Sequence, residues 1–440
     1  MSLLARAIAW FLAYVALITA PLLVAALSNP FEGPRPFLLE ASVALGFIAI
    51  PVILAQFALV SHLRAASRPF GTDALVQFHR YMGFACLAFI VAHPILLNVT
   101  GVPWSAWSPL STNPVTQSGA IAVWALVAIV VTSVFRRGLR MSYELWRVVH
   151  LLLSIAAVVA ILLHIVAVSG YTSVLAMQVL LALYGVACGS VLVAYRFIRP
   201  LWLRRRSWTV VANDDEGAGV RALRVRPDRH GFSFDPGQFA WLITGRSPFS
   251  LEQHPLSIAS SSELPSDGAI DFAVKGLGDW SRETVPRLTP GTRVWVEGAF
   301  GAFTTERKAA QGFMLIAGGI GIAPMRSMLW SMRDRGDRRH VVLLYAALDE
   351  ESIPFRLELE GLRERLHLDI VYVLEKPAPQ WTGERGFVTD EILRRHLPMF
   401  FQRYHYFVCG PPPMMDAVEQ LLVEAGVAPA AIDSERFNVV

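Results

Sequence analysis

The stretch WRVVHLLLSIAAVVAILLHIV, residues 146–166, decides the fold of this chain. It is long and apolar enough to cross a membrane as a helix, yet it contains two histidines, His150 and His164. A second stretch, FHRYMGFACLAFIVAHP, places His79 and His93 at the same spacing of fourteen residues. Fourteen residues of helix return to within about 40° of the starting face and rise about 21 Å. Each helix therefore presents two histidines on one face, near opposite sides of a bilayer.

Composition divides the 440 residues into two unlike halves. The chain is 54% hydrophobic, and long apolar runs fill roughly its first 200 residues. The remainder mixes charges, glycines and prolines as globular domains do, so a membrane half followed by a soluble half is expected. We interpret the first apolar run as a retained helix and not as a signal peptide. Six runs are long enough to cross a hydrocarbon core, near 7–28, 38–60, 75–97, 118–135, 148–169 and 173–195.

Arginines predict the orientation of these spans. They gather in the loops after the second, fourth and sixth spans, whereas the opposite loops contain only Arg35. The positive-inside rule therefore places both termini and the soluble half in the cytoplasm. Much of the net charge of +4 lies in these loops and does not point to a nucleic-acid partner. The spacing of Cys86, Cys188 and Cys409 argues against iron–sulfur clusters, zinc sites and a disulfide framework.

Two helices that run in the same direction with matched histidine pairs can hold two planar groups, one above the other. Haem iron accepts an imidazole from each face, so two stacked haems are predicted. The alternative is that these histidines pack between helices and hydrogen-bond to neighbours. Arg80 and Arg147 adjoin the inner pair, either as partners of haem propionates or as ordinary positive-inside arginines. The predicted axial ligands are His79 with His150 on the cytoplasmic side and His93 with His164 toward the outer side.

The soluble half contains two regions with different sequence patterns. After Arg206, short alternating stretches such as FDPGQFAWLIT and GTRVWVEGAF, with Gly and Pro turns, predict a small antiparallel β-barrel. From Gly312, GFMLIAGGIGIAPMRSML and later strand–helix units predict a parallel, doubly wound α/β sheet. Glycines let a backbone approach a pyrophosphate at a helix N-terminus, although GGIGIAP lacks the GxGxxG spacing. The expected domains are residues 1–200, 205–306 and 307–440.

Five motifs stand in the order found in the ferredoxin–NADP reductase superfamily, namely HPLSIAS, VKGLGDWS, AGGIGIAPM, CGPPPMM and the near-terminal ERF. With the paired membrane histidines, they make the chain resemble the ferric reductase and NADPH oxidase family, as a compact bacterial member. The resemblance implies a six-helix membrane domain, a FAD-binding β-barrel and an NAD(P)-binding α/β domain. It also implies a place in a bacterial inner (plasma) membrane.

The resemblance implies site residues as well. Alternatives exist for single members, since HPLS is also an ordinary strand with a turn, Cys409 a small buried residue and Phe437 a core anchor. Flavin contacts are implied for His254, Pro255, Leu256 and Ser257, and FAD-phosphate contacts for Lys275, Gly276, Gly278 and Ser281. Nicotinamide-dinucleotide contacts are implied for Gly318, Gly319, Gly321 and Pro324, with Cys409, Gly410 and Pro411 beside the nicotinamide. The implied catalytic residues are Ser257, Cys409 and Phe437, the last shielding the flavin ring.

Two departures from the family pattern bear on the cofactors. Leu256 stands where relatives often carry an aromatic residue that stacks on the flavin, and Phe437 is followed by NVV. The dinucleotide is open between NADH and NADPH. After the second strand of the α/β sheet, Asp349 and Glu350 suit a ribose hydroxyl and repel a 2′-phosphate, while Arg356 is the one nearby cation.

The implied activity is electron transfer from cytoplasmic NAD(P)H, through FAD and two b-type haems, to an acceptor on the outer side. A ferric chelate and molecular oxygen, which would give superoxide, are both candidate acceptors, and the short loop SGYTS favours the bulkier chelate. A different hypothesis is a haem-bearing subunit that delivers electrons to a periplasmic protein or to quinone, with the charge-free loop 98–117 as its docking surface. A non-enzymatic membrane scaffold with a degenerate reductase domain is a third.

Overall fold

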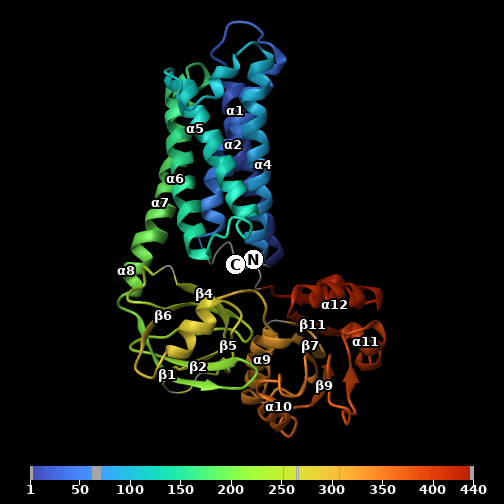
Figure 1. Cartoon of the computed structure of the whole chain (residues 1–440). Helices are drawn as coiled ribbons and strands as arrows, with labels where there is room; N and C mark the ends of the chain where they lie inside the picture. Colours follow the sequence, from blue (N-terminus) through green and yellow to red (C-terminus); the bar gives the residue numbers. More distant parts are fainter. Residues whose placement is uncertain are drawn as a thin grey trace. The chain divides into compact units, whose positions relative to one another are not determined.

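The computed structural model describes residues 3–61, 71–250, 252–263, 265, 267–306 and 308–436 (Figure 1). The chain divides into two compact units, with the boundary between Ile198 and Arg199. The first unit is helical, and the second contains two β-sheets with their helices.

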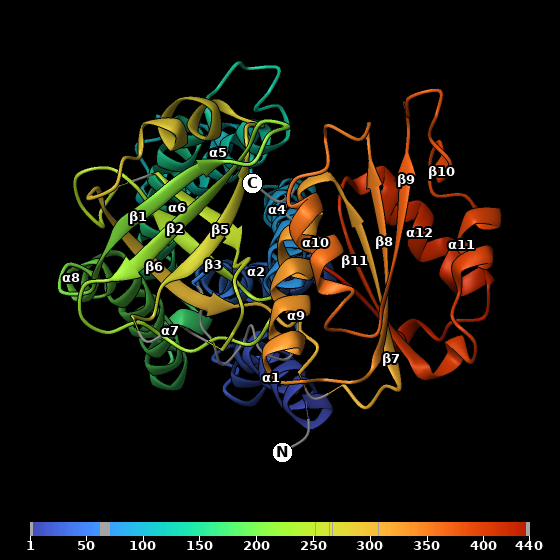
Figure 2. The same cartoon turned by 90° about the horizontal axis from the view of Figure 1, so that it is seen from below.

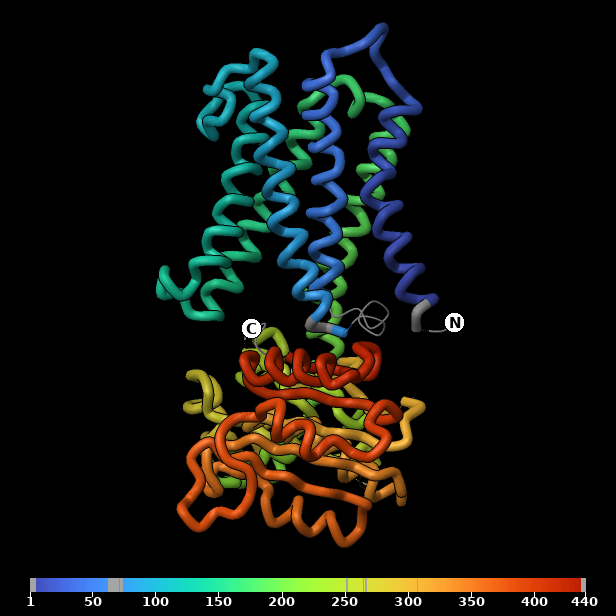
Figure 3. The backbone as a smooth tube through the Cα atoms, turned by 90° about the vertical axis from the view of Figure 1, so that its right-hand side faces the viewer, coloured from blue at the N-terminus to red at the C-terminus, as the bar shows by residue number. Residues whose placement is uncertain are grey.

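Six helices are long and apolar enough to cross a membrane, so the six predicted spans are confirmed. They run side by side in Figures 1 and 3 and expose large apolar side chains such as Leu152, Val159 and Val166. The sixth span continues through a π-helical turn at Ala194–Ile198 and the short helix α8 (Arg199–Leu203), and therefore ends at Leu203. The helices are α1 (Leu3–Leu27), α2 (Phe37–Leu59), α4 (Thr72–Val99), α5 (Pro114–Val134), α6 (Tyr143–Ala167) and α7 (Leu175–Val193).

Capping residues explain why two of these helices begin earlier than hydropathy predicts. Helix α6 starts at Tyr143 because the Ser142 hydroxyl accepts a hydrogen bond from the Leu145 backbone N–H at 3.2 Å. Helix α5 starts at Pro114, where the Asn113 side chain accepts from the Val115 N–H at 2.9 Å. Helix α2 packs along α4, and α5 packs along α6. This pairing leaves α4 and α6 to face each other through their histidines.

The first sheet of the second unit is antiparallel and has the strand order β4-β3-β6-β1-β2-β5. A bridge between Ile258, directly after β4, and Phe272 in β5 brings the two end strands together, which closes the sheet as a barrel does. Trp208, Leu223, Phe272 and Val294 fill its interior. The strands are β1 (Ser207–Asp215), β2 (Val220–Pro227), β3 (Phe239–Ile243), β4 (Gln253–Ser257), β5 (Ile270–Lys275) and β6 (Arg293–Phe300).

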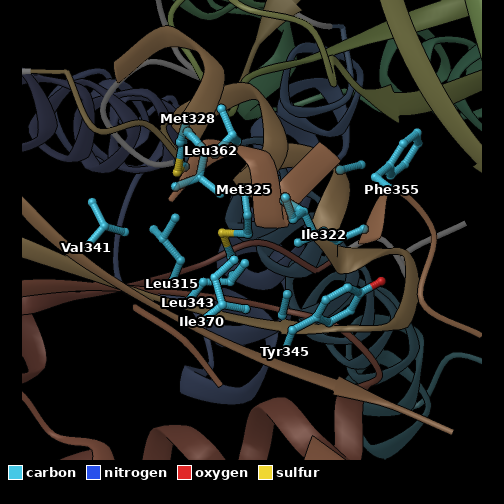
Figure 4. Close-up of a cluster of buried hydrophobic side chains, with 14 of the residues drawn as sticks. Leu315, Ile322, Met325, Met328, Val341, Leu343, Tyr345, Phe355, Leu362 and Ile370 are labelled. Atoms are coloured by element: carbon cyan, nitrogen blue, oxygen red, sulfur yellow. The ribbon is translucent and has the colours of Figure 1, made fainter. Parts of the chain in front are cut away.

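The second sheet is parallel, with the order β10-β9-β8-β7-β11-β12. Helices cover both of its faces (Figure 2): α9 (Ile322–Asp334) and α10 (Arg356–Leu362) on one, α11 (Asp390–His396) and α12 (Pro412–Glu424) on the other. Figure 4 shows the core between α9, α10 and the sheet. The predicted fold class is thus confirmed. The strands are β7 (Gly312–Gly318), β8 (His340–Ala347), β9 (Leu368–Leu374), β10 (Glu384–Arg385), β11 (Tyr404–Cys409) and β12 (Ile432–Ser434).

Candidate functional site

The four membrane histidines meet in two pairs between α4 and α6. The ring centroids of His79 and His150 are 6.3 Å apart, and those of His93 and His164 are 6.4 Å apart. Because the two pairs join the same helices in the same order, α4 and α6 run in the same direction. Two imidazoles bound to one iron from opposite faces, with metal–nitrogen distances of roughly 2 Å, have centroids about 6.3 Å apart. The residues present therefore fit a metal between each pair.

Hydrogen bonds set the orientation of the outer rings. His93 Nδ1 donates to the Ser42 carbonyl oxygen on α2, and His164 Nδ1 donates to the Val115 carbonyl oxygen on α5, both at 2.8 Å. A carbonyl oxygen only accepts, so each Nδ1 carries the hydrogen and each Nε2 keeps its lone pair. A second-shell hydrogen bond of this kind commonly holds a metal-binding histidine in place. The two outer histidines are thus held in the ligating tautomer.

Small and polar residues surround the rings. A Cβ added to Gly119 of α5 would lie 3.0 Å from His164 Nδ1, whereas one added to Gly46 of α2 would lie 3.5 Å from His93 Nδ1. The α5 backbone therefore approaches its ring more closely than α2 does. On the inner side, His150 Nδ1 lies 3.3 Å from the Ser133 hydroxyl of α5. Glycine and serine here leave the space that the imidazoles occupy.

Two arginines lie within one helical turn of the inner pair. Arg80 follows His79 directly and is exposed, and Arg147 precedes His150 by three residues. The Arg147 guanidinium carbon lies 5.6 Å from the centroid of the Tyr143 ring. Neither position decides between a propionate partner and a topology signal, so their role stays a prediction.

Strand β4 carries the segment from His254 to Ser257 and pairs with β3 along its whole length. Ser257 is 7% exposed at the end of the strand, and Leu256 packs against the barrel core. His254 stacks on Trp280, with ring centroids 3.8 Å apart and an interplanar angle of 19°. Sequence reasoning missed Trp280 although it stands inside the motif VKGLGDWS. A tryptophan inside this flavin-type motif was the available signal.

The turn after β5 contains the positions expected at the FAD phosphates. The Ser281 hydroxyl accepts hydrogen bonds from the backbone N–H groups of Leu277 at 3.0 Å and Gly278 at 2.9 Å, and donates to the Gly278 carbonyl at 2.9 Å. In this structure Ser281 therefore holds the shape of its own turn, and its hydroxyl hydrogen is already used. Lys275, at the end of β5, contributes the cation.

Two glycine turns meet at the carboxyl ends of β7 and β11. A Cβ added to Gly321 would lie 2.1 Å from the Cys409 carbonyl oxygen, and one added to Gly410 would lie 3.0 Å from Gly318 Cα. Only glycine permits this contact of backbone with backbone. Gly319 has φ of +53°, a left-handed conformation that favours glycine. Pro324 lies in the first turn of α9, and Pro411 directly precedes α12.

The barrel and the parallel sheet bring their candidate residues together at this turn. Helix α9 starts beside Gly321 with no side-chain cap hydrogen bond, and the N–H of its first residue, Ile322, bonds to the carbonyl of Gly319 in the preceding turn. The positive end of the helix dipole therefore lies at this glycine turn. A Cβ added to Gly319 would lie 3.7 Å from Lys275 Nζ. Arg326 of α9 ties the domains together, since it binds Glu358 through two hydrogen bonds of 2.8 Å and the Ala259 carbonyl of the barrel at 2.8 Å. Sequence reasoning also missed Arg326.

Cys409 is 3% exposed at the end of β11. Burial raises the pKa of its thiol, and the nearby Glu435 carboxylate raises the pKa further. The side chain is therefore a neutral thiol at physiological pH and not a nucleophile. Phe437 lies outside the residues that the structure describes.

The loop after β8 is acidic and uses its own cation. Arg356 Nη1 binds Glu350 Oε1 at 2.9 Å. Asp349 Oδ1 accepts a hydrogen bond from the Ser352 backbone N–H at 2.9 Å, which fixes the carboxylate at the start of the loop. Glu351 is exposed beside them. The segment thus carries more carboxylates than cations, and its arginine is already in an ion pair.

Three parts of the chain match known protein families. Residues 45–161 match the ferric reductase like transmembrane component, residues 215–308 a FAD-binding domain, and residues 315–420 the oxidoreductase NAD-binding domain. A six-helix ferric reductase-like domain joined to FAD- and NAD-binding domains makes this protein a multi-pass membrane oxidoreductase. The chain belongs to the ferric reductase and NADPH oxidase family, whose reductase half is of the ferredoxin–NADP reductase type.

Individual relatives match shorter or longer parts of the chain. NADH-cytochrome b5 reductase 1 of Debaryomyces hansenii is 36% identical over 175 residues, which are 38% of this chain and 60% of the relative. Ferredoxin–NADP reductase B of Sorangium cellulosum is 30% identical over 234 residues, 50% of this chain and 92% of the relative. The flavohemoglobin structure from Malassezia yamatoensis aligns over 90% of this chain and 99% of its own, with a TM-score of 0.48 and 17% identity. The chain thus spans about 60% of the length of the first of these relatives.

Proposed function

We propose that this protein moves electrons across a membrane, from NAD(P)H through FAD and two b-type haems to an acceptor on the other side. One observation carries the proposal: two histidine pairs with nearly equal ring separations, 6.3 and 6.4 Å, stand at two levels of the same two helices. Bound flavin would exchange a hydride for single electrons, and bound haems would pass those electrons on. A helix-packing role alone gives no reason for the same separation at both levels.

In the membrane half, histidines would hold the two haems, and backbone carbonyl groups orient the outer histidines. His79 and His150 would hold the inner haem, and His93 and His164 the outer haem. The carbonyl oxygens of Ser42 and Val115 accept hydrogen bonds from Nδ1 of the two outer histidines. Each Nε2 is therefore unprotonated and lies on the side of the ring opposite the carbonyl. His164 is three residues from the end of α6 at Ala167, so the outer pair lies within about one helical turn of that end.

In the reductase half, the residues bind phosphates and shape the pocket. Lys275 and the uncapped N-terminus of α9 supply positive charge to pyrophosphates, and the glycine turns let the backbone approach them. We propose that His254, Pro255, Leu256 and Ser257 line the flavin, with Trp280 holding His254 in place. Cys409, as a neutral thiol, would shape the space beside the nicotinamide, with Gly410 and Pro411 around it.

For the dinucleotide we propose NADH. A 2′-phosphate would enter a loop with Asp349, Glu350 and Glu351, whose own cation, Arg356, is already paired with Glu350. A carboxylate after the second strand suits a ribose hydroxyl instead.

For topology and acceptor, the observations favour one arrangement. We propose a bacterial plasma membrane, and the arginine-rich loops support a topology with both termini and the reductase half in the cytoplasm. On the outer side, α6 and α7 are joined by one short turn, Tyr171–Ser173, with no large cap. This supports a ferric chelate as acceptor in preference to molecular oxygen. A periplasmic protein partner or quinone is the alternative acceptor.

Stopped-flow absorbance of the haems tests the proposal. The purified full chain, reduced anaerobically with NADH, is mixed with air-saturated buffer or with ferric citrate. Fast reoxidation by ferric citrate and slow reoxidation by air support a ferric reductase. Fast reoxidation by air with a product sensitive to superoxide dismutase identifies an oxidase. A protein that binds no haem, or whose haems are not reduced by a dinucleotide, would overturn the proposal.

A further inference from the structure

A hollow of about 460 Å³ on the barrel has a basic lining. Arg204, Arg246 and Arg293 contribute guanidinium groups, and Phe249 and Trp295 contribute rings. Among the described residues, no aspartate or glutamate lines it. The three arginines come from the turn directly after α8, the loop between β3 and β4, and the start of β6, so the fold gathers them from distant parts of the sequence.

These three arginines differ from most others in the reductase unit. Arg224, Arg326 and Arg395, for example, each bind a carboxylate. In the described part of the chain, Arg204, Arg246 and Arg293 form no ion pair and all are exposed. The hollow therefore has a net positive charge that the protein itself does not neutralise. Such a site is suited to a phosphate group.

The hollow is held directly beside the end of the sixth span. Leu203, the last residue of that span, is 2% exposed and packs against Ile243 of β3 and Trp295 of β6. Arg199 of α8 forms an ion pair with Glu297 of β6. These contacts fasten α8 to the barrel wall, and Arg204 follows Leu203 directly in the chain.

We propose that this hollow binds the phosphate of an anionic phospholipid headgroup. The end of a membrane span is where the chain meets the headgroup layer, and anionic lipids attract arginines placed there. The positive-inside rule accounts for Arg204, but not for Arg246 and Arg293, which belong to the barrel and not to a loop between spans. Phe249, 44% exposed at the rim, supplies an apolar side chain for the acyl boundary.

Native mass spectrometry of the full chain in detergent tests this inference. The protein is titrated with phosphatidylglycerol or with phosphatidylcholine of the same acyl chains, and the bound lipids are counted. We expect preferential retention of one phosphatidylglycerol. The double variant R246Q/R293Q should weaken this binding roughly 25-fold, at about fivefold per arginine. The matched control R226Q/R229Q removes the same charge from exposed positions of the same domain and should leave it unchanged.

Two further arms separate a lipid from free phosphate. F249S should weaken phosphatidylglycerol binding, because the lipid loses its apolar contact. Inorganic phosphate at millimolar concentration should fail to displace the lipid. Equal phosphatidylglycerol binding by wild type and R246Q/R293Q would overturn the inference. Complete displacement by inorganic phosphate, with F249S unaffected, would overturn the lipid assignment and identify a soluble phosphate ligand.

Discussion

The imidazole rings of His93 and His164 face each other across 6.4 Å, although the two residues are separated by 71 positions in the chain. Each ring is held from behind by a backbone carbonyl of a different helix, α2 for His93 and α5 for His164. This separation fits two imidazoles that bind one metal from opposite sides.

Removing an outer histidine should remove one haem. In H93A or H164A, we expect one haem per chain in place of two, because a single imidazole cannot hold the group from both faces. Reduction of bound flavin by NADH should continue, since the reductase half is untouched. Haem is counted by its absorbance after extraction, and flavin reduction is followed by stopped flow. Retention of two low-spin haems in either variant contradicts the ligand assignment.

Two glycine positions give a graded test of the same site. In G119A, the new Cβ would lie 3.0 Å from His164 Nδ1, so the ring must shift, whereas in G46A the corresponding distance to His93 is an ordinary 3.5 Å. We expect G119A to change the spectrum or the reduction potential of the outer haem, and G46A to change neither. Spectroelectrochemical titration of the purified proteins measures both. Identical titrations for G119A and wild type would count against close packing of α5 on His164.

The ion pair between Glu350 and Arg356 should control the choice of dinucleotide. Wild type should prefer NADH, and E350Q should raise kcat/KM for NADPH relative to NADH by roughly 5- to 10-fold, because Arg356 becomes free to meet a 2′-phosphate. Steady-state oxidation of both dinucleotides with ferricyanide measures the ratio.

The controls for this prediction separate pairing from charge. E351Q removes the same charge without releasing Arg356, and its gain should be smaller. E350Q/R356Q should lose the gain altogether. A wild-type preference for NADPH, or equal gains in E350Q and E351Q, argues against this role of the ion pair.

The contact between Gly321 and Cys409 should be needed for stability of the reductase half. G321A would put a Cβ 2.1 Å from the Cys409 carbonyl oxygen, and separating the two turns should cost about 1–3 kcal/mol. A lower melting temperature and weaker NADH binding are expected. G361A, at an exposed position of α10 with nothing within 4 Å of the added Cβ, is the control and should melt at or above the wild-type temperature. Unchanged melting of G321A would show that the turns can separate freely.

Cys409 should resist alkylation in the native protein. Only the thiolate reacts, and burial raises the pKa of this thiol, so the reactive form is scarce at pH 7.5 and becomes more abundant only as the pH rises. Peptide mass spectrometry after iodoacetamide treatment should find Cys409 unmodified in native protein and modified after denaturation. Rapid native labelling at pH 7.5 would mean that β11 opens or that the thiol is ionised.

The sequence by itself determined the features that depend on neighbouring residues, namely the membrane helices and the spacing of residues along them. Hydropathy over about 20 residues locates a membrane helix because every backbone group in lipid must be satisfied within the helix, and all six spans were found. The period of the helix made His79, His93, His150 and His164 a matched set. Motif order and glycine turns predicted the barrel and the parallel sheet.

Tertiary structure alone decided the features that depend on which distant groups meet. Strands β10 and β12 are too short to have a periodic pattern, and only pairing with β9 and β11 defines them. The sequence shows Arg356 as a cation but does not show that Glu350 forms an ion pair with it. It also does not show that the Ser281 hydroxyl donates its hydrogen bond within its own turn. Likewise, the lone pairs of the outer histidines are set by carbonyls on other helices, since a hydrogen bond depends on position in space and not on distance along the chain.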